Sequence, residues 1–269
     1  MRLPILTYHS FDESGSPISV APATFRRHLA RLHAAGYIAL PLSEALERAG
    51  GPTRRQPAPA RERVVALTFD DGYAAVYRHA LPLLADYGWR ATVFPVTDYL
   101  DRDNAWPGQP AFVPPARLLA WGELRELASL GWEVGAHSRT HPDLTRLDDR
   151  ALTEEVIGAK AVLEHRLGQP VQAFAYPYGR CDRRVRAAVR TAYRVACTTV
   201  MGVARGTSDR YALERLDMWY FSRAPLDGLL ASPWMEPYAA LCRAGRRGRG
   251  EVQQAIRCLS TGRRSAGGD

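Results

Sequence analysis

Long apolar runs, a signal sequence and paired cysteines are all lacking in this chain of 269 residues. No apolar run approaches the roughly 18 residues of a membrane-spanning helix, so the sequence predicts none. The N-terminal stretch MRLPILTYHSF has no long apolar core and no small-residue cleavage site; with Met1 as the natural start, we expect a cytoplasmic protein. No C-x-x-C pair occurs, so we expect reduced thiols at all four cysteines, which are Cys181, Cys197, Cys242 and Cys258.

Lysine is nearly absent although the chain is basic. Lys160 is the only lysine, and arginine supplies almost all the positive charge behind the net charge of +8. The arginines form no helical stripe with interleaved aromatic residues, so the charge does not predict nucleic-acid binding. One basic run, RAGRRGR at 243–249, favours a solvated tail, with an anionic partner such as a lipid surface or a phosphorylated glycan carrier as the alternative. We therefore predict one domain over 1–235 and a basic, partly helical or disordered tail over 236–269.

Short β-rich runs alternate with longer amphipathic runs along the domain, which favours a parallel sheet with helices outside. No glycine-rich phosphate loop follows the first strand, so closure into a barrel fits better than an open doubly wound sheet. Such a barrel carries its chemistry at the C-terminal ends of the strands. We expect seven strands, at 5–8, 37–40, 64–69, 91–96, 132–136, 171–176 and 194–200. We expect helices at 23–35, from an N-cap at Ser43, and at 73–87, 121–130, 148–167 and 182–191, with a loop at 50–61.

Two adjacent carboxylates end the third predicted strand, in the stretch TFDDG. Asp70 and Asp71 can face one site if the chain turns tightly there, and Gly72 permits such a turn. Their mutual repulsion then has to be relieved by a cation or a proton. The alternative is a helix N-cap followed by a second acid of the first turn.

Two histidines follow the fifth predicted strand, in GAHSRTHPDL. An H-x-x-x-H pair such as His137 and His141 also occurs by chance, but both segments lie at C-terminal strand ends and should meet on one face of the barrel. Two imidazoles and one carboxylate leave metal positions open for water and substrate, and the second carboxylate is free to act as a base.

TFDDG and H-S-x-x-H, with the flanking words ALTFDDGY, ATVF and GWEVGAHSRTHPDLTRL, resemble the polysaccharide deacetylase superfamily (carbohydrate esterase family four, with the nodulation-type deacetylases). The resemblance covers roughly residues 3–220 and implies a distorted (β/α)7 barrel in a single domain. It also implies that Asp71, His137 and His141 bind a divalent metal, commonly zinc, with Co²⁺, Ni²⁺ or Fe²⁺ as alternatives. Asp70 would be the general base that deprotonates the attacking water.

The family's Arg-x-Pro-Tyr motif corresponds here to AYPYG, residues 175–179. The resemblance implies that the backbone N–H of Tyr178 helps to hold the oxyanion. Ala175 stands where the motif has the arginine that orients the catalytic aspartate, and Arg180 and Arg215 are both candidates to replace it. The AYPYG form resembles the branch of poly-N-acetylglucosamine deacetylases of exopolysaccharide systems.

The family's late Leu-x-His motif, whose histidine protonates the leaving amine, is missing. His165 lies in the middle of a predicted helix, which is typical of a surface residue. In the exopolysaccharide branch this histidine comes from an early L-x-Y-H segment, and LTYH matches it with His9. First and last strands of a closed barrel are neighbours, so His9 can take this role.

The segment ERLDMWYF supplies the candidates for an apolar acetate pocket, Leu216, Met218 and Trp219, with Asp217 as a supporting acid. Trp106, in the long loop after the fourth strand, is a candidate for stacking on a sugar ring. Packing within the domain explains these residues equally well.

The resemblance implies a metal-dependent hydrolase that removes the acetyl group from an N-acetylhexosamine in a glycan or glycoconjugate. Without a signal peptide we expect a nucleotide-linked, lipid-linked or metabolite sugar before a mature extracellular polymer. One alternative is a hydrolase of non-sugar amides with the same fold. Another is a catalytically weak glycan-binding homologue, which the loss of the motif arginine favours and the presence of Asp70 with three metal ligands opposes.

Overall fold

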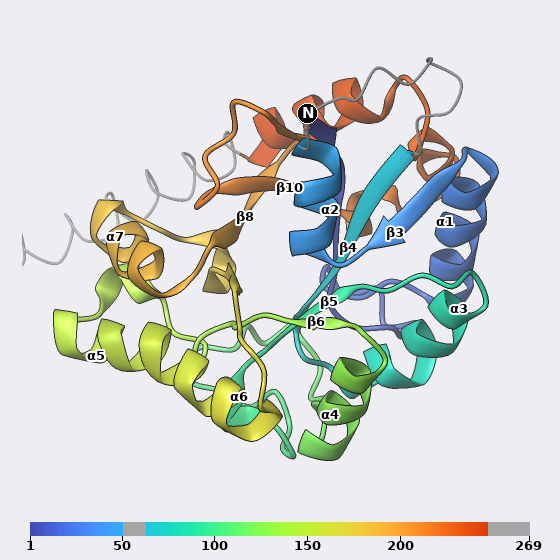
Figure 1. Cartoon of the computed structure of the whole chain (residues 1–269). Coiled ribbons are helices and arrows are strands. Elements are labelled where there is room, and N and C mark those ends of the chain that lie inside the picture. The colour runs from blue at the N-terminus through green and yellow to red at the C-terminus, as the bar shows by residue number, and fades with distance from the viewer. Residues whose placement is uncertain (51–62, 247–269) are drawn as a thin grey trace, which may run out of the picture.

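Seven parallel strands form the ring at the centre of the molecule (Figure 1). We describe residues 1–50 and 63–246 from a computed structural model. The strands follow one another around the ring in the order β6-β5-β4-β2-β10-β8-β7. A parallel bridge between Ala136 and Phe174 joins β6 to β7, so the predicted barrel is nearly closed. The ring strands are β2 (Ile5–Tyr8), β4 (Arg63–Asp71), β5 (Thr92–Pro95), β6 (Glu133–Val134), β7 (Ala173–Ala175), β8 (Val195–Met201) and β10 (Leu213–Asp217).

One predicted ring strand, β3 (Tyr37–Leu40), takes a different place. Ala66 of β4 pairs with Ile5 of β2 on one edge and with Leu40 of β3 on the other, and β5 pairs further along that second edge. β3 therefore pairs with the first half of β4 and β5 with its second half. β10, which lies in the segment ERLDMWYF and was not among the predicted strands, becomes the seventh member of the ring. A further two-stranded pair joins β1 (Arg2–Leu3) to β9 (Ala204–Arg205).

Helices surround the ring (Figure 1), and they follow the predicted ranges closely once two π-helical turns are included, η2 (Val76–Ala80) before α3 and η5 (Glu154–Gly158) between α5 and α6. Asp148 and Asp182 cap their helices, each accepting a hydrogen bond from a backbone N–H three residues later. Ser43 is not the expected N-cap, because α2 begins one residue earlier and the Ser43 hydroxyl donates to Glu133 instead. The helices are α1 (Pro22–Ala34), α2 (Leu42–Gly50), α3 (Leu81–Ala85), α4 (Trp121–Ser129), α5 (Asp149–Thr153), α6 (Ala159–Leu167) and α7 (Arg183–Ala192).

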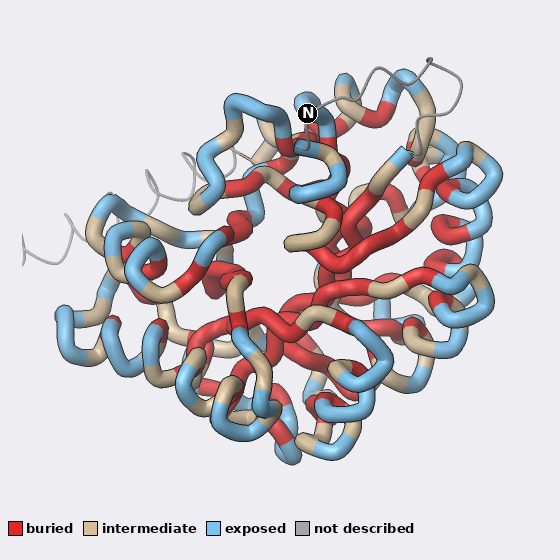
Figure 2. Tube along the Cα trace, viewed as in Figure 1, coloured by how far each residue is buried: buried red, intermediate tan, exposed pale blue. Residues whose placement is uncertain are grey.

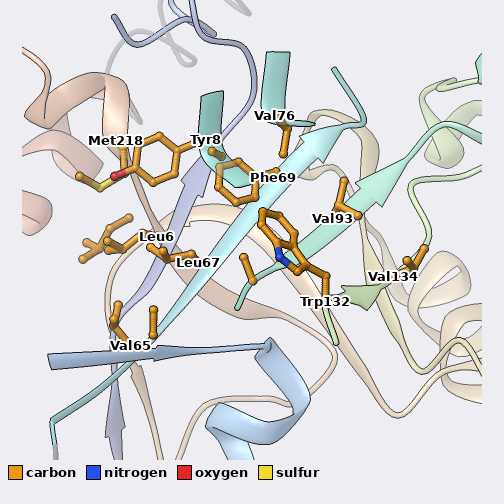
Figure 3. Packing of buried hydrophobic residues seen from close by; sticks show 14 of the residues in the cluster. Leu6, Tyr8, Val65, Leu67, Phe69, Val76, Val93, Trp132, Val134 and Met218 are labelled. Carbon is orange, nitrogen blue, oxygen red and sulfur yellow. The ribbon is translucent and has the colours of Figure 1, made fainter. Parts of the chain in front are cut away.

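Strand alternation creates two apolar layers. Figure 2 shows the buried strands inside a shell of partly exposed helices. Ile5, Ala66 and Phe94 belong to a small cluster with Ala173 and Leu213. The side chains that alternate with these point to the other face of the sheet and pack into the larger cluster with the helices; they include Leu6, Leu67, Val93 and Met218 (Figure 3). Ile5 belongs to the small cluster and Thr7 lies 3.4 Å from Thr68 of β4, so both side chains face inward. Alternation predicts the same side for His9, just after the strand.

Three predictions concern features outside the ring. Cys181, Cys197 and Cys242 form no disulfide among the described residues, as expected, while Cys258 lies outside those residues. The predicted loop falls almost entirely on residues 51–62, which also lie outside the described part of the chain, as does the tail after 246. No helix in the described part of the chain is long and apolar enough to cross a membrane.

Candidate active site

Three buried side chains converge at the C-terminal end of the barrel. The Nε2 atoms of His137 and His141 lie 3.2 and 3.3 Å from Oδ1 of Asp71. The potential ligand atoms of the three residues all lie within 4.8 Å of one another, and each residue is buried. Asp71 ends β4 and the histidines follow β6, so the structure brings together the ligands that the sequence predicted.

Left-handed backbone conformations turn these side chains toward one point. Asp71, Ser138 and His141 have φ angles of 67°, 64° and 62°, values that side chains other than glycine adopt at an energetic cost. Gly72 follows Asp71 at φ 77°, and a Cβ there would come within 3.0 Å of Pro95. The strand thus ends in the tight turn that lets both Asp70 and Asp71 serve one site.

The hydrogen bonds of the histidines show why a cation suits this cluster. Nδ1 of His137 lies 2.7 Å from the carbonyl oxygen of Ala175, which can only accept, so Nδ1 carries the proton and Nε2 presents its lone pair to Asp71. Nδ1 of His141 is buried without a hydrogen-bond partner among the described residues. Imidazole lone pairs and a carboxylate facing one another repel unless a cation lies between them, and this donor set suits a divalent metal ion.

The pKa shifts agree with an anionic centre between imidazoles. Burial would raise the pKa of Asp71, but the adjacent imidazoles of His137 and His141 hold it well below its ordinary value. Burial lowers the pKa of His141, whereas for His137 the contact with Asp71 outweighs burial and raises the pKa.

Asp70 is held apart from the cluster by a buried ion pair. Nη1 and Nη2 of Arg215 lie 2.8 and 2.6 Å from its two carboxylate oxygens, and both side chains are at most 2% exposed. Arg215 also donates to Thr68 and to the carbonyl oxygen of Thr198, so its buried charge is well satisfied. Burial would raise the pKa of Asp70, but the Arg215 guanidinium outweighs burial and keeps the pKa below its usual range.

This pair decides which arginine stands in for the residue missing at Ala175. Arg215 reaches Asp70 from β10, on the far side of β2 from β4. Arg180 instead pairs with Asp143 and lies over the ring of Tyr178. Ala175 itself contributes only its carbonyl oxygen, which orients His137.

His9 and Tyr178 both lie at this end of the barrel. His9 is half-buried just after β2, close enough to Asp70 and Asp71 to contribute to their lowered pKa values against the effect of burial. Tyr178 follows β7 with a left-handed φ of 57°, and its ring lies edge-on to His141 at 4.6 Å. The geometry thus places both residues near the metal ligands, while their catalytic roles stay predictions.

The four predicted substrate contacts differ in exposure. Trp106 is 2% exposed, with its ring against His141 at 4.6 Å, so it has no open face for a sugar in this arrangement. Leu216 and Met218 are fully buried in the cluster between barrel and helices, with Met218 beside Tyr8 (Figure 3), so packing accounts for both and nothing in their placement supports an acetate pocket. Trp219 is partly exposed and remains a candidate for contact with the substrate.

Sequence reasoning missed the residues that brace the loop between the two histidines. Glu155, on the helical segment after α5, accepts hydrogen bonds from the backbone N–H groups of Arg139 and Thr140 at 2.8 and 2.9 Å. The Arg139 side chain is in turn paired with Asp98. An acid on an amphipathic helix is indistinguishable in one sequence from any solvated acid, so no pattern pointed to Glu155.

Known proteins resemble the chain in sequence and in structure. The family model described as polysaccharide deacetylase matches residues 58–196. The protein YxkH of Bacillus subtilis, provisionally named a polysaccharide deacetylase, is 30% identical over 216 residues, which are 80% of this chain and 71% of the relative.

Two solved structures share the fold. The Streptococcus pyogenes deacetylase PplD, solved in complex with acetate, has a TM-score of 0.71 at 28% identity and covers 88% of this chain and 99% of its own. IcaB from Ammonifex degensii has a TM-score of 0.66 at 24% identity over 86% of this chain and 97% of its own, a likeness of fold alone.

Proposed function

The chain belongs to the polysaccharide deacetylase family, and from this premise we propose that it is a metal-dependent N-deacetylase. Its substrate is an N-acetylhexosamine in a glycan or glycoconjugate, and it releases acetate by hydrolysing the acetamido group. The observation that carries the proposal is the pairing of an Asp-His-His cluster with a separate carboxylate, Asp70, fixed by Arg215.

Asp71, His137 and His141 would hold the metal, for which we propose zinc because two imidazoles and a carboxylate form a typical zinc donor set. Co²⁺, Ni²⁺ and Fe²⁺ accept the same ligands. When bound, the ion supplies Lewis acidity toward water and the acetamido carbonyl.

Asp70 acts in this proposal as the general base. Arg215 keeps it ionised near neutral pH and fixes both carboxylate oxygens, so the side chain is oriented before substrate arrives. Asp70 takes a proton from the attacking water, and the backbone N–H of Tyr178 donates to the oxyanion that forms on the acetamido oxygen.

Expulsion of the amine requires a proton, because an amide anion is a prohibitive leaving group near neutral pH. His9 is the candidate donor. It follows a strand that pairs with both β4 and β10, and its inward parity directs it toward the site. The bond between the carbonyl carbon and nitrogen then breaks to give acetate and the free amine.

Acetate release tests the proposal directly. The metal-loaded chain should release acetate from N-acetylglucosamine oligomers or nucleotide-linked N-acetyl sugars, and Asp70→Asn should keep the metal but lose at least about a hundredfold in kcat. Asp86→Asn, an exposed acid at the end of α3, serves as the control and should leave turnover unchanged.

Three outcomes would contradict it. Undiminished release by Asp70→Asn would remove Asp70 from its role. Release from peptides or cyclic amides but from no sugar would favour the non-sugar amide hydrolase. Glycan binding without release from any compound would favour the binding homologue.

A further inference from the structure

The last described helix, at residues 235–246, presents an outward face without a single charged residue. Trp234, just before it, is 67% exposed and Leu241 is 69% exposed, the highest values among large apolar side chains of the described residues. Every exposed position from 233 to 245 is proline, tryptophan, alanine, leucine or glycine. Trp234, Pro237, Leu241 and Ala244 follow one another at the three- and four-residue spacing of a helix face.

The opposite face of this helix is fixed on the barrel. Met235, Ala239 and Cys242 belong to the large core cluster and are at most 9% exposed. At one end Glu236 pairs with Arg2 and Arg205. The outward face is thus a fixed surface, and its exposure does not result from a loosely attached segment.

The other end of the helix is tied to the active-site end of the barrel. The Arg246 guanidinium pairs with Asp217, donates to the hydroxyl of Tyr220 at 3.0 Å and donates to the carbonyl oxygen of Thr199 at 2.9 Å. Asp217 ends β10 and pairs with Thr7 of β2, and Thr7 lies two residues before His9 in the chain. Whatever the helix contacts therefore lies beside the rim that carries the site.

Arginine borders this apolar face without interrupting it, unlike on α7, which exposes Arg183 and Arg190 on its outward face. Arg243 and Arg246 instead flank the apolar stripe, and positions 231–269 contain seven arginines and three acidic residues. Apolar surface framed by arginine is complementary to a bilayer with anionic headgroups.

We propose that the face formed by Trp234, Pro237, Leu241 and Ala244 docks on the surface of a membrane that contains anionic lipid. Tryptophan is favoured at the boundary between headgroups and acyl chains, and leucine buries apolar area there. A second copy of this chain fits less well, because it would present the same apolar face bordered by the same arginines and so offers no excess of negative charge to complement them. Docking would hold the rim of the barrel, through Arg246, next to the bilayer surface.

Vesicle co-sedimentation with the full-length, metal-loaded chain tests this. The chain should sediment with vesicles of phosphatidylcholine and phosphatidylglycerol, much less with phosphatidylcholine alone, and less as salt rises. Trp234→Glu and Leu241→Glu should each weaken vesicle binding by about tenfold or more, since each places a charge in the apolar contact. Leu130→Glu is the matched control, because Leu130 is 51% exposed at the end of α4, across the barrel from the red C-terminal helix (Figure 1).

The outcomes separate this proposal from the catalytic one. Acetate release from a soluble substrate should be unchanged in Trp234→Glu and Leu241→Glu, because both residues lie outside the site. Equal sedimentation of the parent and both variants, or no sedimentation with anionic vesicles, would overturn the lipid proposal. A dimer in sedimentation equilibrium that Trp234→Glu dissociates would overturn it in favour of a second copy.

Discussion

A single pair of buried charges, Arg215 and Asp70, fixes the side chain that we propose as the general base. We predict that Arg215→Lys lowers kcat by roughly tenfold to a hundredfold, because lysine keeps the charge but cannot bind both carboxylate oxygens at once. Metal content should stay at one ion per chain, since Arg215 does not touch the ligands. Steady-state acetate release together with metal analysis measures both quantities.

Arg90→Lys supplies the control for that substitution. Arg90 pairs with Glu44 on the surface, where both side chains are about 40% exposed, and its replacement should change neither kcat nor stability measurably. Full turnover in Arg215→Lys would show that Asp70 needs no bidentate partner, and loss of metal in this variant would assign Arg215 to the metal site instead.

Part of this site could be predicted from the sequence at the level of single residues. Asp70, Asp71, His137 and His141 stand at the ends of recognisable strands, and parallel strands in a barrel bring such ends together. The choice between Arg180 and Arg215 could not be made, because it depends on where β10 lies relative to β4. The left-handed turns at Asp71 and His141 were also beyond prediction, since the site imposes conformations that these residues rarely adopt alone.

At the scale of elements, the seven-step alternation predicted the ring, yet it assigned one strand to the wrong place. The stretch YIAL has the composition of a ring strand, and only its pairing shows that it lies beside the first half of β4, where β5 pairs with the second half. LERLD carries three charged residues in five, so its pattern is weaker than that of a buried parallel strand. Arg215, one of those charges, points to Asp70 inside the barrel, which is why this strand escapes the usual apolar pattern.

His28 joins three elements beneath the site, and its burial should make stability depend on pH. Its Nδ1 lies 3.0 Å from the hydroxyl of Tyr8 on β2, and its Nε2 lies 3.0 Å from the carbonyl oxygen of Phe221. Burial lowers the pKa of His28 to about 4, so the imidazole is neutral in the folded chain. The unfolded chain binds the extra proton below about pH 6.5, and we expect roughly 2–3 kcal/mol of stability to be lost from this residue by pH 4.5.

Urea unfolding of the parent and of His28→Gln at pH 7 and 4.5 measures this loss. The variant should be the less stable at pH 7, and the difference between the two should shrink by about 2 kcal/mol at pH 4.5, because glutamine does not titrate. His33→Gln, on the exposed side of the same helix α1, is the matched control. A difference between parent and His28→Gln that is the same at both pH values would show that His28 is not buried neutral.

For the whole molecule, the three proposed metal ligands connect distant parts of the ring. Asp71 ends β4, whereas His137 and His141 follow β6 and are braced by Glu155 on the helical layer. β5 separates the two ligand-bearing strands. An ion bound by all three residues would therefore stabilise the closed barrel against unfolding, in addition to its chemical role.

Removing the ion should lower the melting temperature of the parent chain by about 5–10 °C, if the free metal exceeds its dissociation constant about a hundredfold. Calorimetry with and without a chelator measures the shift, and added zinc should reverse it. Asp71→Asn and His137→Asn should melt at temperatures that the chelator no longer changes, because each removes a ligand from the cluster. His165→Asn, exposed on α6, should respond to the chelator as the parent does. The parent chain could contain one ion and still melt at the same temperature with and without the chelator. The ion would then bind the folded and unfolded chains equally, and the cluster would have no role in holding the ring together.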